Sequence, residues 1–404
     1  MSATLTLYRN LRCIISILTS SAIVCTAQPL APKQAYPFTV KQIHSGHSLT
    51  DPLFYPHWPG QYVNLVASVT QQSSWQLVNR LIGKSTAPGS QMSYRWENPP
   101  GNDAPDARHD ILNWELLSIT ERVPLLYEGG STQQWYKDGI IAQRNALSLF
   151  VNNAWTQGNG GKGAATLLWT TWVHVDGSSG NFRSMLDVQG QEWERMQDLA
   201  NQKRPAGAPP VYLIPGHKMM ARLHDDIAKG IVPGITNITQ FFSDQIHTNE
   251  LGAYAIAMIH YACIFNRSPL GLPHKLIPNA PSGTPMPTPE LATYLQNMVW
   301  DVVTSYDRTG ISASTSVQEG QAKLDIILSP QPANDVLTVT CKSPATQIGT
   351  IHIHDIAGCL VAQAEVSQGA STAHINVQHL PAGVYVLTIA DPLGVESTTW
   401  LKVE

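Results

Sequence analysis

Short apolar runs alternate with stretches of helical periodicity over the long first part of the chain. Four runs bounded by turn residues have the length and composition of strands: Val40–His44, Glu115–Thr120, Ala165–Trp172 and Val211–Ile214. Apolar positions repeat with helical spacing from Ile140 to Ala154 and from Leu251 to Ala262, and a further helix is predicted over Pro289–Tyr306. Strands that alternate with helices indicate a parallel sheet covered on both faces, so the pattern predicts an α/β body.

The pattern changes after Lys323. Five strand-like runs separated by Pro, Gly and Asn turns follow: Leu324–Leu328, Val336–Cys341, Ile351–Ile356, His374–Val377 and Gly383–Ile389. This spacing is typical of a small all-β sandwich of ~80 residues. A stretch rich in Ser, Thr, Gln and Gly precedes it, which predicts a linker at 310–323 between a body at 28–309 and a tail at 324–404.

Residues 1–27 have the layout of a secretory signal peptide. Arg9 and Arg12 precede a short apolar run, and small residues at Cys25 and Ala27 favour cleavage before Gln28. The apolar run is shorter than the ~20 residues that a membrane span needs, and no other stretch is long and apolar enough to cross a bilayer. A lipid anchor on Cys25 is disfavoured by the bulky Val24 before it.

Composition narrows the classes of protein further. The chain carries 25 Lys and Arg against 29 Asp and Glu, and only 13% of its residues are charged. Loss of the two signal-peptide arginines takes the net charge from −4 to −6. Apolar content of 43% excludes a disordered chain, and the lack of a basic excess argues against a nucleic-acid partner.

Three cysteines remain once the signal peptide is removed. Cys263 lies in an apolar run and is expected to be a buried small hydrophobe. Cys341 and Cys359 are close enough in sequence to form a disulfide, and whether they pair is left open. No cysteine pair has the spacing of zinc ligands.

The tail resembles the C-terminal sorting domain of type IX secretion. The similarity rests on three blocks, Pro330–Leu337, Ile351–Gly358 and Leu380–Leu387, with Gln331 at a position where the family usually has Asn. It implies a Gram-negative bacterium, passage across the outer membrane by the type IX machinery, and release or attachment at the cell surface. His352 and His354 alternate onto one strand face, and a polar exposed face is favoured over a metal pair.

The stretch Ile43–Leu53 has the features of a nucleophile turn. A predicted strand runs into Gly46, and Ser48 follows at the expected carboxyl edge of the sheet. Nucleophiles of α/β enzymes lie at this edge, although Ser is also a favoured residue at helix N-termini.

A second stretch supplies the partners that such a serine needs. Asp244 and His247 are three residues apart, just before a predicted helix. A serine that attacks an acyl group needs a histidine base, and the histidine needs a carboxylate to orient it. The alternative is that Asp244 caps a turn and His247 is an ordinary histidine.

Together, and in this order, the two stretches resemble the SGNH (GDSL-like) hydrolases. Gly46-His47-Ser48-Leu49 is similar to the first family block, with His47 where an acid is usual, and Asp244–His247 is similar to the last. The resemblance implies a three-layer flavodoxin-like fold with Ser48 as nucleophile, His247 as general base and Asp244 as its orienting partner. It implies no metal and no organic cofactor.

The middle blocks of that family, which complete the oxyanion hole, are harder to place. Besides Ser48 itself, Gly89 is the preferred backbone donor, with Gly83 behind it. Other positions considered for the second donor are Gly101-Asn102-Asp103, Thr120-Glu121, Asn152, Asn153 and Asn159. Losing one donor costs ~10²–10³ in rate, so this gap bears directly on activity.

Several other features favour structural roles. Gly158–Gly163 lacks the Ser or Thr of a phosphate loop, and the mixed-charge runs Lys137–Arg144 and Glu192–Arg204 are expected on solvated helix faces. Histidines at 44, 47 and 57 gather near Ser48, yet no carboxylate at matching spacing supports a metal site. Tryptophans at 58, 96, 169 and 172 are possible sugar platforms, with core packing the default.

The sequence therefore predicts a secreted serine esterase of SGNH type, acting on an acylated glycan or another extracellular ester. The rival hypothesis is a non-catalytic surface protein on the same scaffold that binds a glycan or an adhesion partner. A lipase or thioesterase is a third alternative. The acyl group, the oligomeric state and cleavage of the tail are not specified by the sequence.

Overall fold

The computed structural model describes residues 30–54, 59–98, 100, 104–126, 140–312, 326–341, 349–355, 360–367, 369–391 and 394–403. The predicted signal peptide, most of the predicted linker and Cys359 lie outside these residues. Within them, no helix combines the length and apolar character needed to cross a membrane.

A five-stranded parallel sheet forms the centre of the first unit, with the strand order β2-β1-β3-β4-β5. Its strands are β1 (Gln42–Gly46), β2 (Ile82–Thr86), β3 (Leu116–Ile119), β4 (Ala165–Thr170) and β5 (Tyr212–Pro215). The chain leaves β1 for β2 on one side and then crosses to β3 on the other. The strand order therefore reverses at β1, and doubly wound sheets bind their ligands outside the carboxyl ends of the strands at such a point.

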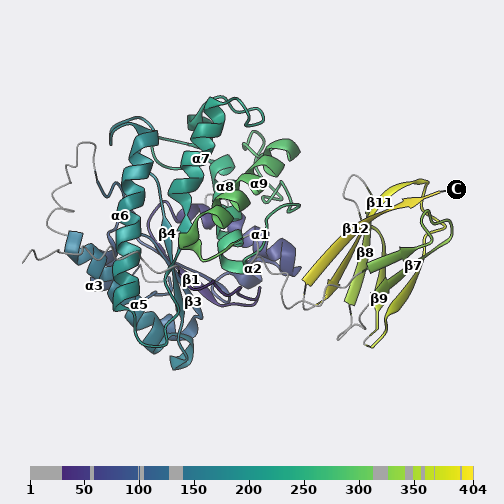
Figure 1. The fold of residues 1–404 in the computed structure, drawn as a ribbon, viewed down its shortest axis with the longest axis horizontal. Helices are drawn as coiled ribbons and strands as arrows, with labels where there is room; N and C mark the ends of the chain where they lie inside the picture. The colour runs from purple at the N-terminus through teal and green to yellow at the C-terminus, as the bar shows by residue number, and fades with distance from the viewer. Residues whose placement is uncertain are drawn as a thin grey trace, which may run out of the picture.

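Helices cover both faces of this sheet (Figure 1). One face carries α3 (Met92–Glu97), α5 (Ile140–Gly161) and α6 (Phe182–Lys203). The other carries α1 (Gln61–Thr70), α8 (Glu250–Phe265) and α9 (Pro289–Ser305), with α7 (Gly216–Ala228) beside the β5 edge. Shorter elements complete the unit: η1 (Asp51–Leu53), α2 (Ser74–Leu77), η2 (Ile111–Asn113), η4 (Ile238–Phe241) and η5 (Asp307–Thr309). The predicted α/β body is confirmed.

Helix α8 is the buried centre of its layer. From Leu251 to Phe265 every side chain is buried, because α1 and α9 pack on either side of it. A helix that is apolar all round belongs in a core, and this one fixes the segment that precedes it. Cys263 is 1% exposed, as predicted, and burial raises the pKa of its thiol to about 12.

The second unit consists of antiparallel sheets, which confirms the predicted all-β tail. One sheet has the order β10-β7-β6 and the other β12-β11-β8-β9. The strands are β6 (Ile326–Ser329), β7 (Val336–Cys341), β8 (Gly349–Asp355), β9 (Leu360–Val366), β10 (Thr372–Asn376), β11 (Gly383–Asp391) and β12 (Gly394–Lys402). Alternate residues such as Leu337, Val339, Ile351 and Ile353 form its own core.

Some elements differ from the sequence expectations. Strands β2, β9 and β12 and helices α1, α2, α3 and α7 were not predicted, and β4 ends at Thr170, two residues before the predicted end. The run that begins at Glu192 was expected on a solvated face, but this carboxylate is 1% exposed. It is buried because Arg144 on α5 bonds both of its oxygens at 2.7 Å.

Candidate active site

The turn after β1 places Ser48 at the carboxyl edge of the sheet. The strand ends at Gly46, and the backbone N–H of Thr50 then bonds the His47 carbonyl at 2.8 Å. A Cβ on Gly46 would lie 2.0 Å from the Thr50 hydroxyl oxygen, so only glycine fits before this turn. Ser48 stays partly exposed while His47 and Leu49 on either side are buried.

A loop before α8 carries Asp244 and His247 to the same place. Phe242 and Thr248 form a β-bridge at its base, and the Ser243 N–H bonds the His247 carbonyl at 2.8 Å. Asn249 then caps α8 by accepting N–H bonds in its first turn. The loop is therefore a closed turn fastened to a buried helix.

Two bonds from the chain after β4 hold the outer side of this loop. The Trp172 indole N–H donates to the Ile246 carbonyl at 2.8 Å, and the Val175 N–H donates to the Gln245 carbonyl at the same distance. Trp172 is fully buried, as the default interpretation of this residue predicted. Its packing makes the His247 position rigid, because the loop cannot move without breaking a buried contact.

The structure brings Ser48, His247 and Asp244 together. The His247 Nε2 lies 2.8 Å from the Ser48 Oγ, across 199 residues of sequence. Its Nδ1 lies 2.7 Å from the Asp244 Oδ2. The other carboxylate oxygen, Oδ1, accepts the backbone N–H groups of Ile246 at 2.8 Å and His247 at 2.7 Å.

These contacts set the ionisation of Asp244. Burial alone raises the pKa of a carboxyl, but here the backbone N–H bonds from His247 and Ile246 and the bond from the His247 ring outweigh it. The pKa of Asp244 is therefore lowered. An ionised carboxylate accepts the proton on Nδ1, which leaves Nε2 as the lone-pair nitrogen facing the Ser48 hydroxyl. The arrangement has the geometry for proton transfer from serine to histidine.

The histidine and the carboxylate are open to solvent. The His247 side chain is 42% exposed and that of Asp244 is 43% exposed. A hollow of about 420 Å³ lies along the same edge of the sheet, lined by residues 87–91, Tyr94 and Arg122. Such an open edge admits a group carried on a large molecule.

Two backbone N–H groups are available near the serine. Neither the Ser48 N–H nor the Gly89 N–H has a hydrogen-bond partner among the described residues. The Ala87 N–H bonds the Gly46 carbonyl at 3.0 Å, which draws the exposed loop containing Gly89 beside the end of β1. Gly89 has a φ of +62°, a backbone conformation that glycine adopts without strain.

The other positions considered for the oxyanion hole do not lie there. Gly83 is buried inside β2 against the ring of Trp114. Thr120 and Glu121 follow β3 as predicted but are fully buried. The asparagines at 152, 153 and 159 all belong to α5, and residues 101–103 lie outside the described residues.

The contacts of Asn159 show why the asparagines of α5 cannot donate to an oxyanion at Ser48. Its N–H bonds the carbonyl of Trp114 at 2.8 Å, just before β3 begins. Asn159 is therefore at the amino edge of the parallel sheet, opposite Ser48. The Asn153 amide donates to the Arg108 carbonyl at 2.7 Å, so it supports a loop.

His47 is a structural part of the nucleophile turn. Its Nδ1 accepts the Leu49 N–H at 3.3 Å, and its Nε2 donates to the Glu121 carbonyl at 2.9 Å. Burial, aided by the charge of Arg95, lowers the pKa of His47 to about 3, so the ring is neutral. His44 is also fully buried, and the described residues contain no grouping of His, Cys, Asp or Glu that fits a metal ion.

Arg95 and Glu121 join the ends of three strands beneath the turn. The sequence patterns did not indicate this role. Arg95, on α3, donates to the Ser45 Oγ at 3.2 Å and to the Ser90 carbonyl at 2.9 Å, and it also bonds the Thr120 carbonyl. Glu121 accepts the backbone N–H of Met92 at 2.8 Å. A lone Arg in a short helix carries no sequence signal for this role.

Burial shifts the pKa values of both Glu121 and Arg95. Desolvation raises the pKa of Glu121 to about 7, although Arg95 and two backbone N–H bonds act against it. Desolvation lowers the pKa of Arg95 to about 10, against the opposing effect of Glu121. The two groups therefore stabilise each other's charge under the nucleophile turn.

Comparison with known families identifies the tail. Residues 328–401 match the secretion system C-terminal sorting domain. The protein is therefore exported by type IX secretion. In Bacteroidetes such a domain indicates secretion and attachment at the outer surface of the cell. No curated protein matches the chain.

Three solved structures show weak likenesses to this chain. A DUF3244 family protein with an immunoglobulin-like β-sandwich from Bacteroides vulgatus is 27% identical over 18% of this chain and 78% of its own, with a TM-score of 0.16. An engineered protein is 13% identical over 90% of this chain and 93% of its own, with a TM-score of 0.26. An endo-β-1,4-mannanase double mutant from Cellulomonas fimi is 11% identical over 91% of this chain and 95% of its own, with a TM-score of 0.22. Scores this low carry no argument about fold or activity.

Proposed function

We propose that the body is a serine esterase of SGNH type that removes acyl groups from an extracellular ester. The observation that carries the proposal is the hydrogen-bonded series Ser48–His247–Asp244, with distances of 2.8 and 2.7 Å. Distances of ~2.6–3.2 Å between nucleophile, base and orienting group are those that a serine hydrolase needs. The strand order 2-1-3-4-5, that of flavodoxin-like folds, supports the same assignment.

In this mechanism the Ser48 oxygen attacks the ester carbonyl while His247 Nε2 takes the hydroxyl proton. Asp244 keeps the Nδ1 proton in place and stabilises the imidazolium that forms. The N–H groups of Ser48 and Gly89 bind the oxyanion. His247 then protonates the leaving alcohol, and a water activated by the same ring releases the acid from Ser48.

An acylated glycan is the proposed substrate class. The sorting domain places the enzyme at the cell surface, where polymers too large to enter the cell are met. The half-exposed His247 and the hollow beside Gly89 suit a small acyl group that projects from a long chain. A site for a free lipid would instead require a broad apolar groove to cover the acyl tail.

One observation favours the rival function, a non-catalytic binding protein on this scaffold. The segment after β3 carries the buried Thr120 and Glu121, and neither side chain is exposed at the site. The oxyanion would then rely on backbone donors alone. Each missing donor costs ~10²–10³ in rate, so a very slow enzyme and a binding protein must be separated by experiment.

Hydrolysis of p-nitrophenyl acetate by the full chain tests the proposal. Ser48→Ala is the inactive variant, and Ser68→Ala is the matched control, because Ser68 only bonds the Leu65 carbonyl within α1. Turnover in the wild type and in Ser68→Ala, lost in folded Ser48→Ala, supports the esterase. Equal rates in all three folded proteins reject it in favour of the binding protein.

A further inference from the structure

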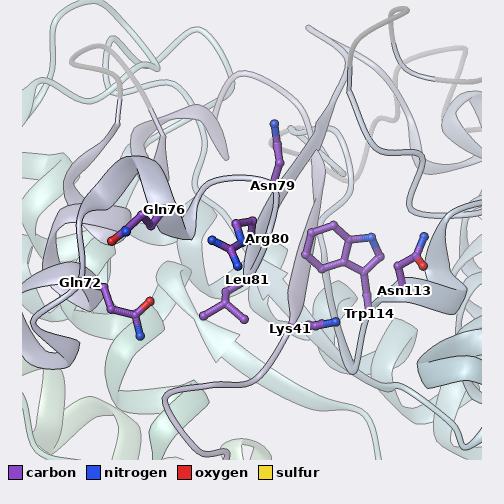
Figure 2. A pocket seen from close by; sticks show the side chains of 8 residues that line it. All are labelled: Lys41, Gln72, Gln76, Asn79, Arg80, Leu81, Asn113 and Trp114. Carbon is purple, nitrogen blue, oxygen red and sulfur yellow. The ribbon is translucent and has the colours of Figure 1, made fainter.

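A polar hollow of about 580 Å³ is lined by Lys41, Arg80, Trp114 and several amide side chains (Figure 2). Lys41, Leu81 and Trp114 line it from positions one or two residues before β1, β2 and β3. These positions mark the amino edge of a parallel sheet, whereas Ser48 lies at the carboxyl edge. The hollow is therefore separate from the candidate active site.

The lining combines two cations with amide groups. Figure 2 shows Arg80 with the amide side chains of Gln72, Gln76 and Asn79 around it, and Lys41 beside Trp114. Lys41 and Arg80 form no ion pair with any residue that the structure describes, although the Lys41 backbone N–H bonds the Glu115 carboxylate at 2.8 Å. Cations that lie beside amides and form no ion pair with a described residue suit a ligand that has both a negative charge and hydroxyl groups.

The backbone around this hollow is rigid. Ser73 and Gln76 bond each other in a capping box at the start of α2. Asn79 adopts a φ of +59° and donates its N–H to the Ile82 carbonyl, which turns the chain sharply into β2 and presents Arg80 outward. A preformed site loses little entropy when it binds.

A second hollow, of about 500 Å³, lies on the other side of the same short helix. Its lining includes Trp75, Asn64, Ser74 and Asn279. Trp75 is 61% exposed, which is unusual for so large an apolar side chain. Ser74 donates to the Asn64 Oδ1 at 2.6 Å, so the polar groups beside the ring are fixed.

We infer that these two hollows and Trp75 form a binding surface for an acidic oligosaccharide. The C–H face of a sugar ring packs on the exposed indole, because both surfaces leave water on contact. Amide and hydroxyl groups on either side of α2 bond the sugar hydroxyls. Arg80 and Lys41 bind the carboxylate or sulfate of a neighbouring unit. The surface would hold the enzyme on a polymer without taking part in the chemistry at Ser48.

Calorimetric titration with hexagalacturonate, and with a neutral galactan oligomer of the same length, tests this inference on the full chain. Arg80→Ala and Trp75→Ala should each weaken hexagalacturonate binding ~10-fold, the value of one lost strong contact. The exposed Lys275 and Leu270 provide matched controls, Lys275→Ala for charge and Leu270→Ala for apolar surface.

Ser48→Ala separates this inference from the proposed esterase, because that variant should bind as the wild type does. Preferential binding of the acidic oligomer that is lost in the two test variants and kept in both controls supports the surface. Absence of binding, equal binding of the neutral oligomer, or equal affinity in Arg80→Ala and Trp75→Ala overturns it.

Discussion

The ring of His47 bonds the main-chain carbonyl of Glu121 at 2.9 Å and so ties the nucleophile turn to the end of β3. Its other nitrogen accepts the Leu49 N–H. Ser48 is thereby held between two buried neighbours while its own hydroxyl reaches His247. His47 is therefore a neutral structural support of this turn.

Replacement of His47 should therefore damage both stability and catalysis. His47→Ala leaves the Glu121 carbonyl with only the long 3.4 Å bond from the Thr120 hydroxyl and opens a cavity, which should cost ~2–4 kcal/mol of unfolding free energy. His47→Gln restores an N–H donor and should recover part of that loss. Urea unfolding and kcat for p-nitrophenyl acetate measure the two effects. Wild-type stability in His47→Ala would refute the supporting role.

The orientation of His247 can be tested through Asp244. Asp244→Asn replaces the acceptor for Nδ1–H with an amide, which favours the wrong tautomer and should lower kcat ~10²–10⁴-fold with KM little changed. Asp225→Asn is the matched control, because Asp225 is a partly exposed acid on α7 paired with Arg183. An unchanged kcat in Asp244→Asn would remove Asp244 from the mechanism.

Arg95 should be indispensable for the strand ends beneath the turn. Arg95→Met removes the donor to the Ser90 and Thr120 carbonyls and the positive charge that favours ionised Glu121, so it should destabilise the fold by ~2–4 kcal/mol. The double variant with Glu121→Gln removes both charges, so it should be more stable than the sum of the single changes predicts. Lys275→Met, at an exposed cation, is the control. Strict additivity in the cycle would contradict a coupled pair.

Buried neutral histidines should make the protein sensitive to acid. Burial lowers the pKa of His47, His217 and His260 to about 3, and lowers that of His44 as well. In the unfolded chain these rings have a pKa of ~6.5, so they take up protons on unfolding between about pH 3 and 6.5. Their contribution to stability is complete above about pH 6.5 and is lost as the pH falls, by ~1.4 kcal/mol per pH unit for each proton taken up.

The raised pKa of Glu121 acts in the opposite direction, since it favours the folded state below about pH 7. Glu121 is a single group, whereas four buried histidines act in the other direction. Urea unfolding should therefore show lower stability at pH 5 than at pH 8. His260→Gln should flatten that dependence, whereas His109→Gln, at a side chain 69% exposed, should leave it unchanged. Identical slopes in all three proteins would contradict this explanation.

Sequence patterns predicted the parts of the fold that depend on local periodicity. Strands β1, β3, β4 and β5 and helix α8 were found because their apolar runs are long or regular. Strand β2 was missed, because Ile-Gly-Lys-Ser-Thr has one bulky apolar residue and is a strand only by pairing with β1. Tertiary pairing of this kind leaves no local signal.

The residues of the candidate site likewise fall into those that the sequence predicted and those that it missed. Ser48, Asp244 and His247 were found because their chemistry requires these residue types in short motifs. Arg95 and Glu121 were missed, because their role depends on three strand ends meeting in space. The sequence therefore identified the groups that we propose react, whereas the structure identified the residues that hold the turn beneath them.

Fluorophosphonate labelling followed by intact-mass and peptide analysis tests the central claim most directly. The reagent reacts with a serine only where a base activates it, whatever ester the enzyme takes in nature. The account predicts one label on Ser48 in the wild type, strongly reduced labelling in His247→Ala, and none in Ser48→Ala. A folded wild-type protein that takes up no label, or takes it up on another serine, would contradict the account.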